Sequence, residues 1–157
     1  MTLGGGATGA TVAGLPAGVT ANVSGTTVTI SGTPTATGPF TYTVTTTGNT
    51  CTTASTTGTI TVTPIHAITA GSNRTVCQNA TMSAITMTLA GGATGATVTG
   101  LPTGVTGSVT GTTLTISGIP TVSGTFNYVV TTTGNSCTVA TTGGIITVSP
   151  IHTITAG

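Results

Sequence analysis

A repeat with a period of 86 residues constrains this 157-residue chain more than any other feature. Sliding the sequence on itself by 86 positions aligns Met1 with Met87 without a gap, and 51 of the 71 overlapping positions carry the same residue. Solenoid repeats run from about 20 to 50 residues, so a period of this length indicates a complete small domain. We therefore expect two modules, at residues 1–71 and 72–157.

The first module lacks the counterpart of residues 72–86, and Met1 falls where the repeat has an internal methionine. In one interpretation, the chain is a segment of a longer array of modules. In the other, it is a subunit whose incomplete first module receives its missing strand from a neighbouring molecule, as in donor-strand complementation. The first residues have neither the basic n-region nor the apolar h-region of a signal peptide.

Strands are predicted throughout both modules. Alternation of β-branched and other residues with period 2 recurs at residues 27–31, 40–45 and 58–63, and such residues fit a pleated, half-buried surface. Gly-rich turns separate these segments at intervals of about 8 to 12 residues, which is typical of a β-sandwich. No segment carries the apolar stripe of a helix, so the predicted fold is all-β: tandem β-sandwich modules with essentially no helix.

One strand of each module carries nearly all of the aromatic residues. In residues 40–45 the large side chains alternate with threonines, so they share one face of the strand, and the second copy keeps them. We predict that this face lies in the core, which would contain Phe40, Tyr42, Val44, Phe126, Tyr128 and Val130.

The three cysteines predict a disulfide framework. Cys77 lies near the start of the second module and Cys137 near its end, and a bond between them would close a loop of about 60 residues and stabilise the module by about 4 kcal/mol. Cys51 would then pair with a cysteine outside this sequence. A rival pairing of Cys51 with Cys77 would join one module to the next. Because disulfides persist in oxidising compartments, either arrangement places the protein outside the cytoplasm.

The charge composition excludes most catalytic chemistry. The chain has no Asp or Glu, and Arg74 is its only Lys or Arg. Paired carboxylates, a Ser-His-Asp triad and a carboxylate calcium site therefore cannot form. One arginine cannot supply a nucleic-acid site, and no run of about 18 apolar residues is present to insert into a membrane. We expect no enzymatic activity and no cofactor.

Three kinds of short motif in the sequence are candidates for a site. Residues 4–9 (GGGATG) match G-x-G-x-x-G, but neither a following helix nor an acidic residue accompanies them, so we interpret them as a β-turn. His66 and His152 occupy equivalent places in PIHAITAG and PIHTITAG. Because they lack the close ligand pairs of zinc sites, we predict linker residues that pack between modules and no metal site. Three sequons are candidate glycosylation sites, at Asn22, Asn73 and Asn79.

Residues 14–48 and 100–134 carry a more specific pattern, GLPAGVT followed by TISGTPTATGPFTYTVTTTG in the first copy. This pattern resembles the bacterial immunoglobulin-like tandem repeat. The near-identical, Thr-rich copies are similar to surface adhesins and extracellular filament proteins of Bacteroidota. The resemblance implies Ig-like sandwiches at a bacterial cell surface or outside the cell. The chain departs from antibody-type Ig domains in having no Trp, and from cadherin-like domains in having no acidic calcium ligands.

Two functions fit these observations. The first is a structural module of an extracellular fibre or of the stalk of a cell-surface adhesin. Such a module would assemble with copies of itself through exposed strand edges, or space a distal binding tip. The alternative is a carbohydrate-binding Ig-like module of a secreted protein. That function would need exposed aromatic or polar clusters on the loops at one end of the sandwich, and the sequence offers few.

Overall fold

The structure, a computed structural model, describes residues 1–48, 52–134 and 136–154. These residues form strands, turns and loops, with no helix among them, which confirms the all-β prediction. The chain divides into two compact units, Met1–Thr63 and Pro64–Gly157. The division falls at Pro64, whereas the repeat predicted a boundary at residue 72, because residues 64–71 pack on the second unit.

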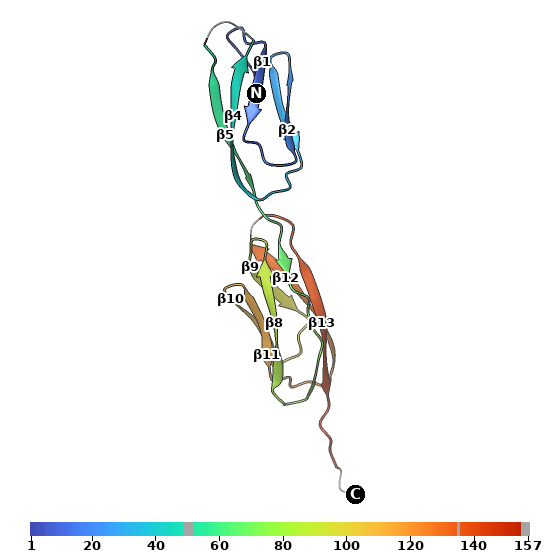
Figure 1. Ribbon diagram of the computed structural model, residues 1–157. Coiled ribbons are helices and arrows are strands. Elements are labelled where there is room, and N and C mark those ends of the chain that lie inside the picture. The colour runs from blue at the N-terminus through green and yellow to red at the C-terminus, as the bar shows by residue number, and fades with distance from the viewer. Residues whose placement is uncertain (49–51, 135, 155–157) are drawn as a thin grey trace. The chain divides into compact units, whose positions relative to one another are not determined.

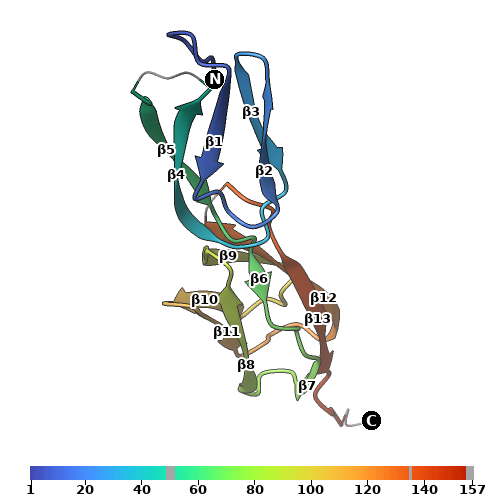
Figure 2. The ribbon, with the colours of Figure 1, turned by 45° about the horizontal axis from the view of Figure 1, so that its top comes forward.

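The second unit is a β-sandwich of two four-stranded sheets (Figure 1). One sheet has the strand order β10-β11-β8-β6 and the other β7-β13-β12-β9, and Figure 2 shows the same strands from another direction. In chain order the strands are β6 (Ala67–Ile68), β7 (Arg74–Cys77), β8 (Met82–Ala90), β9 (Ala93–Thr99), β10 (Val105–Thr110), β11 (Thr113–Gly118), β12 (Gly124–Gly134) and β13 (Thr141–Ser149).

The beginning of the second unit contributes one strand to each sheet. β6 pairs antiparallel with β8, and β7 then pairs parallel with β13, the last strand of the unit. The other described pairings within the unit are antiparallel. The start and the end of the unit are therefore joined side by side within one sheet.

The first unit repeats the strand arrangement of residues 87–149. β4 pairs with β1 and β5 to form a three-stranded sheet, and β2 pairs with β3. An isolated bridge between Thr2 and Thr27 adds the start of the chain to the β2-β3 sheet. In chain order the strands are β1 (Gly9–Ala13), β2 (Val19–Ser24), β3 (Thr27–Gly32), β4 (Gly38–Thr47) and β5 (Ser55–Val62).

The strand register is the same in both units. Val12 lies opposite Val44 in the first unit, and their counterparts Val98 and Val130 lie opposite each other in the second. Because the repeat aligns Met1 with Met87, the described residues of the first unit include no counterpart of β6 or β7. The first unit has the same arrangement without those two strands, and only the bridge of Thr2 with Thr27 stands in the place of β8.

The large side chains of β12 point into the core of the second unit. Tyr128 and Val130 are buried, and Phe126 is partly buried against the same cluster. In the first unit, Val44 is buried and Tyr42 packs against its cluster, whereas Phe40 is half-buried. The first core is smaller because fewer strands cover it.

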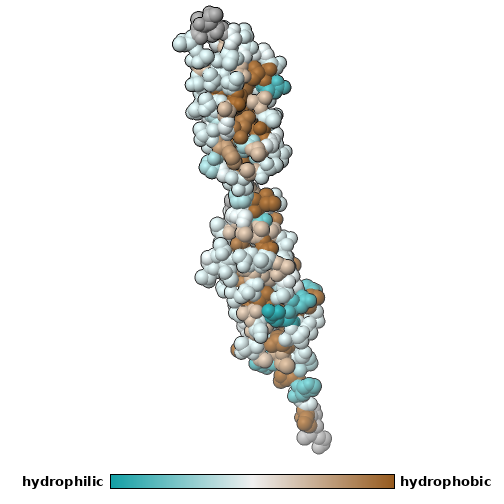
Figure 3. Space-filling model, viewed as in Figure 1, coloured by the Kyte–Doolittle hydropathy of each residue, from teal (hydrophilic) through white to brown (hydrophobic). Residues whose placement is uncertain are grey.

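Pale atoms of intermediate hydropathy make up most of the visible surface of both units (Figure 3). Threonine and glycine lie near the middle of the hydropathy scale, so most of the surface is pale, with small brown apolar areas and few teal ones. This surface follows from a chain whose charged residues make up 1% of the total. Coulombic repulsion between copies is therefore weak.

Candidate functional site

No cluster of metal-binding side chains is present in the described parts of the chain. They contain no group of three or more His, Cys, Asp or Glu residues that could hold a metal ion. They also contain no helix long and apolar enough to span a membrane. Residues 4–9 form a turn that leads into β1, without the helix that a dinucleotide site requires. The best candidate site is instead a strand-binding one, which in the second unit holds residues 64–72.

His66 anchors this segment inside the second unit. Its side chain is 5% exposed, and its Nδ1 lies 2.9 Å from Oγ1 of Thr132 on β12. Its backbone N–H donates to the carbonyl oxygen of Thr138, at 3.2 Å. The expected linker histidine therefore packs within the second unit.

The hydroxyl of Thr132 explains how a buried imidazole is tolerated here. This oxygen accepts from Ala140 N at 2.8 Å and donates to Ala140 O at 3.1 Å. The hydroxyl proton is thereby used, so the hydroxyl accepts from His66, whose Nδ1 carries the proton of this hydrogen bond. Thr132 is fully buried, and its hydroxyl makes three hydrogen bonds.

Strand β6 continues the segment along the edge of β8. Ala67 pairs with Ala90, and Ile68 pairs with Leu89. Thr69 then donates its backbone N–H to Thr88 O at 3.0 Å and accepts the Thr88 N–H on its own hydroxyl at 2.9 Å. Ile68 is partly buried against the main core cluster.

Gly91 allows the segment to approach this edge. Its φ is +66°, a conformation that favours glycine, and a Cβ atom on it would collide with the carbonyl oxygen of Ile65. Any side chain at position 91 would therefore displace the backbone just before His66.

The end of the segment is held by the opposite sheet. Gly71 N donates to the Thr142 hydroxyl at 2.9 Å. The Tyr128 hydroxyl accepts from Ser72 N at 3.0 Å and donates to Ser72 O at 2.9 Å. The segment thus begins against one sheet and ends against the other, which makes it part of the fold of the second unit.

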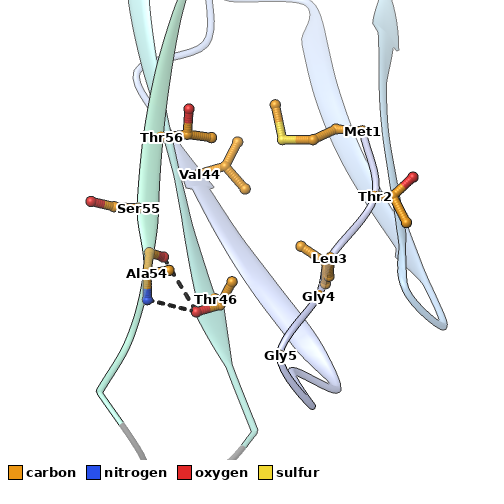
Figure 4. Close-up of a pocket in the computed structure, with 10 residues that line it drawn as sticks. All are labelled: Met1, Thr2, Leu3, Gly4, Gly5, Val44, Thr46, Ala54, Ser55 and Thr56. Atoms are coloured by element: carbon orange, nitrogen blue, oxygen red, sulfur yellow. Dashed lines mark hydrogen bonds between the residues drawn. The ribbon is translucent and has the colours of Figure 1, made fainter.

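A pocket of about 400 Å³ lies at the equivalent position of the first unit. It is lined by residues 1–5, by Val44 and Thr46 of β4, and by residues 54–56. Figure 4 shows the side chains of Met1, Leu3 and Val44 turned toward its interior. Most of this lining is aliphatic carbon, with threonine and serine hydroxyls on the β4 and β5 side.

The lining matches the residues that hold the segment in the second unit. By the repeat, Met1, Leu3 and Gly4 correspond to Met87, Leu89 and Ala90 of β8. Met87 is 1% exposed in the core cluster against which Ile68 packs, whereas Met1 is 49% exposed and lines the pocket. A Cβ atom on Gly5, the counterpart of Gly91, would meet nothing within 4 Å, although its φ is +64°.

Thr46 is the counterpart of Thr132, whose hydroxyl makes the hydrogen bond with His66 in the second unit. Its Oγ1 accepts from Ala54 N at 2.9 Å and donates to Ala54 O at 3.3 Å, as Thr132 does with Ala140, and Figure 4 draws both bonds. In the second unit the remaining lone pair of this oxygen accepts from His66. The pocket therefore offers an acceptor position at its polar wall.

The sequence that fills the site in the second unit occurs again after β13. Residues 150–157 read PIHTITAG, against PIHAITAG at residues 64–71. Of these, residues 150–154 are described, and all are exposed. Ile154 is 100% exposed, whereas its counterpart Ile68 packs against the core.

The structure does not bring Cys77 and Cys137 together, which corrects the expected bond between them. Cys77 pairs with Ser149 at the end of β13, whereas Cys137 precedes Thr141 at the beginning of that strand. The nine residues of β13 span roughly 26 Å at about 3.3 Å per residue. A disulfide requires Cα atoms within about 7 Å. Cys51, and with it the rival pairing, lies outside the described residues.

The three candidate glycosylation asparagines are exposed. Asn22 lies on β2. Asn73 uses its Oδ1 to accept the backbone N–H of Ile145 at 2.9 Å. Asn79 adopts a left-handed conformation with φ of 63°. Of the three, Asn73 has its amide oxygen engaged in the fold.

Comparison with known proteins identifies the fold. No family model matches the chain, and no curated protein sequence matches it. Among solved structures, an I-band fragment of titin is similar with a TM-score of 0.63 at 14% identity, over 90% of this chain and 55% of that chain. A mutated three-Ig titin structure gives the same values. At this identity the likeness shows the fold alone: the units are Ig-like domains.

Proposed function

We propose that this chain is a structural module of an extracellular fibre, or of the stalk of a cell-surface adhesin, that spaces a distal binding tip. The proposal places it on a bacterial surface, as the resemblance of its repeats to bacterial adhesin modules implies. Its partners are then copies of the same module.

The parallel pairing of β7 with β13 carries this proposal. Ile146, Thr147, Val148 and Ser149 lie opposite four consecutive residues of β7. Tension applied to the two ends of the unit pulls these parallel strands past each other, so their hydrogen bonds bear the load together. A module built in this way suits a shaft under tension.

The connection into the second unit supports the same role. Residues 64–72 are fixed by hydrogen bonds to β8, β12 and β13, with His66 buried among them. Because this connection belongs to a folded unit, it extends little when the chain is pulled.

Single-molecule force spectroscopy tests the proposal. In one pulling geometry, handles are attached at the two ends of the second unit, residues 64 and 151. In the other, they are attached at Cys77 and residue 151, which lie at the same end of the β7-β13 pair, so the bonds open one after another. We expect a clearly higher unfolding force in the first geometry. Equal forces would argue against a load-bearing role. Antibody labelling of intact cells of the native host would test the surface location.

The pocket in the first unit favours the structural role over the carbohydrate-binding alternative. Small-molecule sites combine apolar and aromatic surface with a few placed polar groups. None of the residues that line this pocket is aromatic. A lining of aliphatic carbon and small hydroxyls without an aromatic ring suits a strand better than a sugar ring.

A further inference from the structure

We propose that β10 (Val105–Thr110) of the second unit pairs antiparallel with β10 of a second copy of this chain, so that one sheet continues from copy to copy. The inference deepens the proposed self-assembling role and rests on it, because it names the edge through which two copies meet. β10 lies at the end of its sheet beside β11, and no described strand lies on its other side. Figure 2 shows it at this margin.

Among the described edge strands of the second unit, β10 alone lacks a feature that hinders strand pairing. β6 has two residues, β7 carries Arg74, and the register of β9 with β12 shifts at Gly134. β10 keeps one register with β11 over six residue pairs and carries neither proline nor a charged side chain. Proteins commonly protect their edge strands by charge, proline, bulges or short length. β10 is therefore open to a further strand.

The hydrogen bonds of β11 fix which way the backbone of β10 faces. Thr112 O accepts from Leu89 N at 2.7 Å, so the backbone groups of Thr112 face β8. Neighbouring residues of a strand direct their backbone groups to opposite sides. Thr113 therefore faces β10, where it lies opposite Thr110, and the groups of Thr110 face β11 in return.

Alternation along β10 then turns two residues outward. Ser108 shares the direction of Thr110, toward β11, whereas Gly107 and Val109 face the other way. Each of these two residues offers one N–H and one C=O on the side where no described strand lies. These four groups are what a further antiparallel strand would bind.

A two-fold register centred on Ser108 matches the strand with itself. Gly107 of each copy then lies opposite Val109 of the other, and the two such pairs exchange four N–H···O=C bonds. The branched side chain of Val109 meets a residue without a side chain, so the inner face is not crowded. A Cβ atom on Gly107 would lie 2.8 Å from Cγ2 of Val98, so the incoming Val109 also meets the apolar side chain of β9.

The contact suits copies that lie side by side in an array. One strand edge is a small interface beside the roughly 1,200 Å² or more of stable complexes, so a single pair of copies associates weakly. Where several copies pair at once, each contact raises the effective concentration for the next. The same surface is used by both copies, so the contact is closed and joins two shafts laterally.

Cysteine cross-linking tests this register. It uses the full chain with Cys51, Cys77 and Cys137 replaced by serine, to which Ser108→Cys is added. In the proposed pair the two Cα atoms at position 108 lie about 4.5 Å apart, within the range that a disulfide spans. Mild oxidation at high chain concentration should therefore give a covalent dimer.

Two single variants are matched controls. Thr106 and Thr110 are exposed on the same face of β10 as Ser108, but in the proposed register each lies opposite the other and not opposite itself. Thr106→Cys and Thr110→Cys should each give at least tenfold less dimer than Ser108→Cys when oxidised alone, and should cross-link efficiently when mixed. Equal yields from all three variants would indicate random collision and would overturn the register.

Exchange of charge gives a readout without a covalent bond. Ser108→Lys places two ammonium groups opposite each other, and Ser108→Glu two carboxylates, so each variant alone should associate several-fold more weakly than the parent chain. An equimolar mixture of the two should associate more strongly than either alone, as measured by sedimentation equilibrium. Damage to the fold would not be reversed by mixing, so the absence of this rescue would contradict the proposal.

The first unit supplies the last comparison. Asn22 on β2 is the counterpart of Ser108, and Ala21 stands there in the place of Gly107. A dimer from Asn22→Cys with none from Ser108→Cys would move the contact to β2 and overturn the proposal, as would no dimer from either. The force measurement is made on single molecules, so the load-bearing role is decided independently of these results.

Discussion

Nδ1 of His66 lies 2.9 Å from Oγ1 of Thr132, although the two residues are 66 positions apart in the sequence. The imidazole comes from the connection into the second unit, and the hydroxyl comes from β12 in the opposite sheet from β6. This hydrogen bond is one of several that make the connection part of the sandwich, so its removal should lower the stability of the second unit.

Replacement of the histidine should destabilise the second unit selectively. We expect His66→Ala to lower its free energy of unfolding by about 1 to 3 kcal/mol, because Thr132 loses a buried partner and a cavity forms. Hydrogen exchange of the β12 and β13 amides, followed by NMR, measures this change. His152→Ala is the matched control, since that side chain is exposed, and it should leave these amides unchanged. Equal effects of both variants would contradict the assigned role of His66.

The hydroxyl of Tyr128 should contribute to stability in the second unit. It bonds both to Ser72 N and to Ser72 O, so Tyr128→Phe leaves two backbone groups without this partner. We expect a loss of about 1 to 2 kcal/mol, measured by chemical denaturation. The control is Tyr42→Phe, because the described residues of the first unit include no counterpart of Ser72. A loss of the same size at Tyr42 would show that the ring environment, and not the Ser72 contact, sets the cost.

Two glycines with the same backbone conformation should respond differently to a methyl group. Gly5 and Gly91 have φ of 64° and 66°, so alanine at either carries the left-handed penalty of about 1 to 2 kcal/mol. At Gly91 the Cβ atom also collides with the Ile65 carbonyl oxygen, whereas at Gly5 it meets open space. We expect Gly91→Ala to cost roughly 1 to 3 kcal/mol more than Gly5→Ala. Thermal unfolding of the chain at a concentration where it is monomeric compares the two. Equal costs would mean that residues 64–66 move aside readily.

The cysteine placement predicts a particular disulfide map. Because β13 separates them, Cys77 and Cys137 of one folded unit should give no linked peptide. Cys77 is exposed and should be alkylated in the native state under reducing conditions. Peptide mapping by mass spectrometry without prior reduction checks both statements. Recovery of a Cys77–Cys137 peptide from folded material would contradict the described pairing of β7 with β13.

Local patterns in the sequence were sufficient to predict the strands and their inward faces. The segments at 27–31, 40–45 and 58–63 lie within or along β3, β4 and β5. The face that carries Tyr128 and Val130 is buried as its alternation indicates. Such predictions succeed because alternation along one strand reports which side faces the core, and this requires no knowledge of the neighbouring strands.

The pairing of distant segments needed the tertiary structure. Cys77 and Cys137 stand near the two ends of one repeat and were expected to meet, but β7 runs parallel to β13 and carries Cys77 to the far end of that strand. No local pattern indicates the contacts of residues 64–72 with Thr132, Gly91 and Tyr128. The sequence feature that could have pointed to these contacts is the recurrence of PIH-x-ITAG, which begins at residue 64 and again at residue 150.

The sequence by itself determined that this protein is a repeated, all-β chain with no acidic residue and Arg74 as its only Lys or Arg, because composition, period and alternation are properties of the chain. Only the tertiary structure decided that residues 64–71 belong to the second unit, that a pocket with the matching lining is open in the first, and which cysteines are kept apart. Those outcomes depend on sheet order and strand direction. They arise from the burial of β6 and β7 against partners tens of residues away, and local periodicity carries no information about such partners.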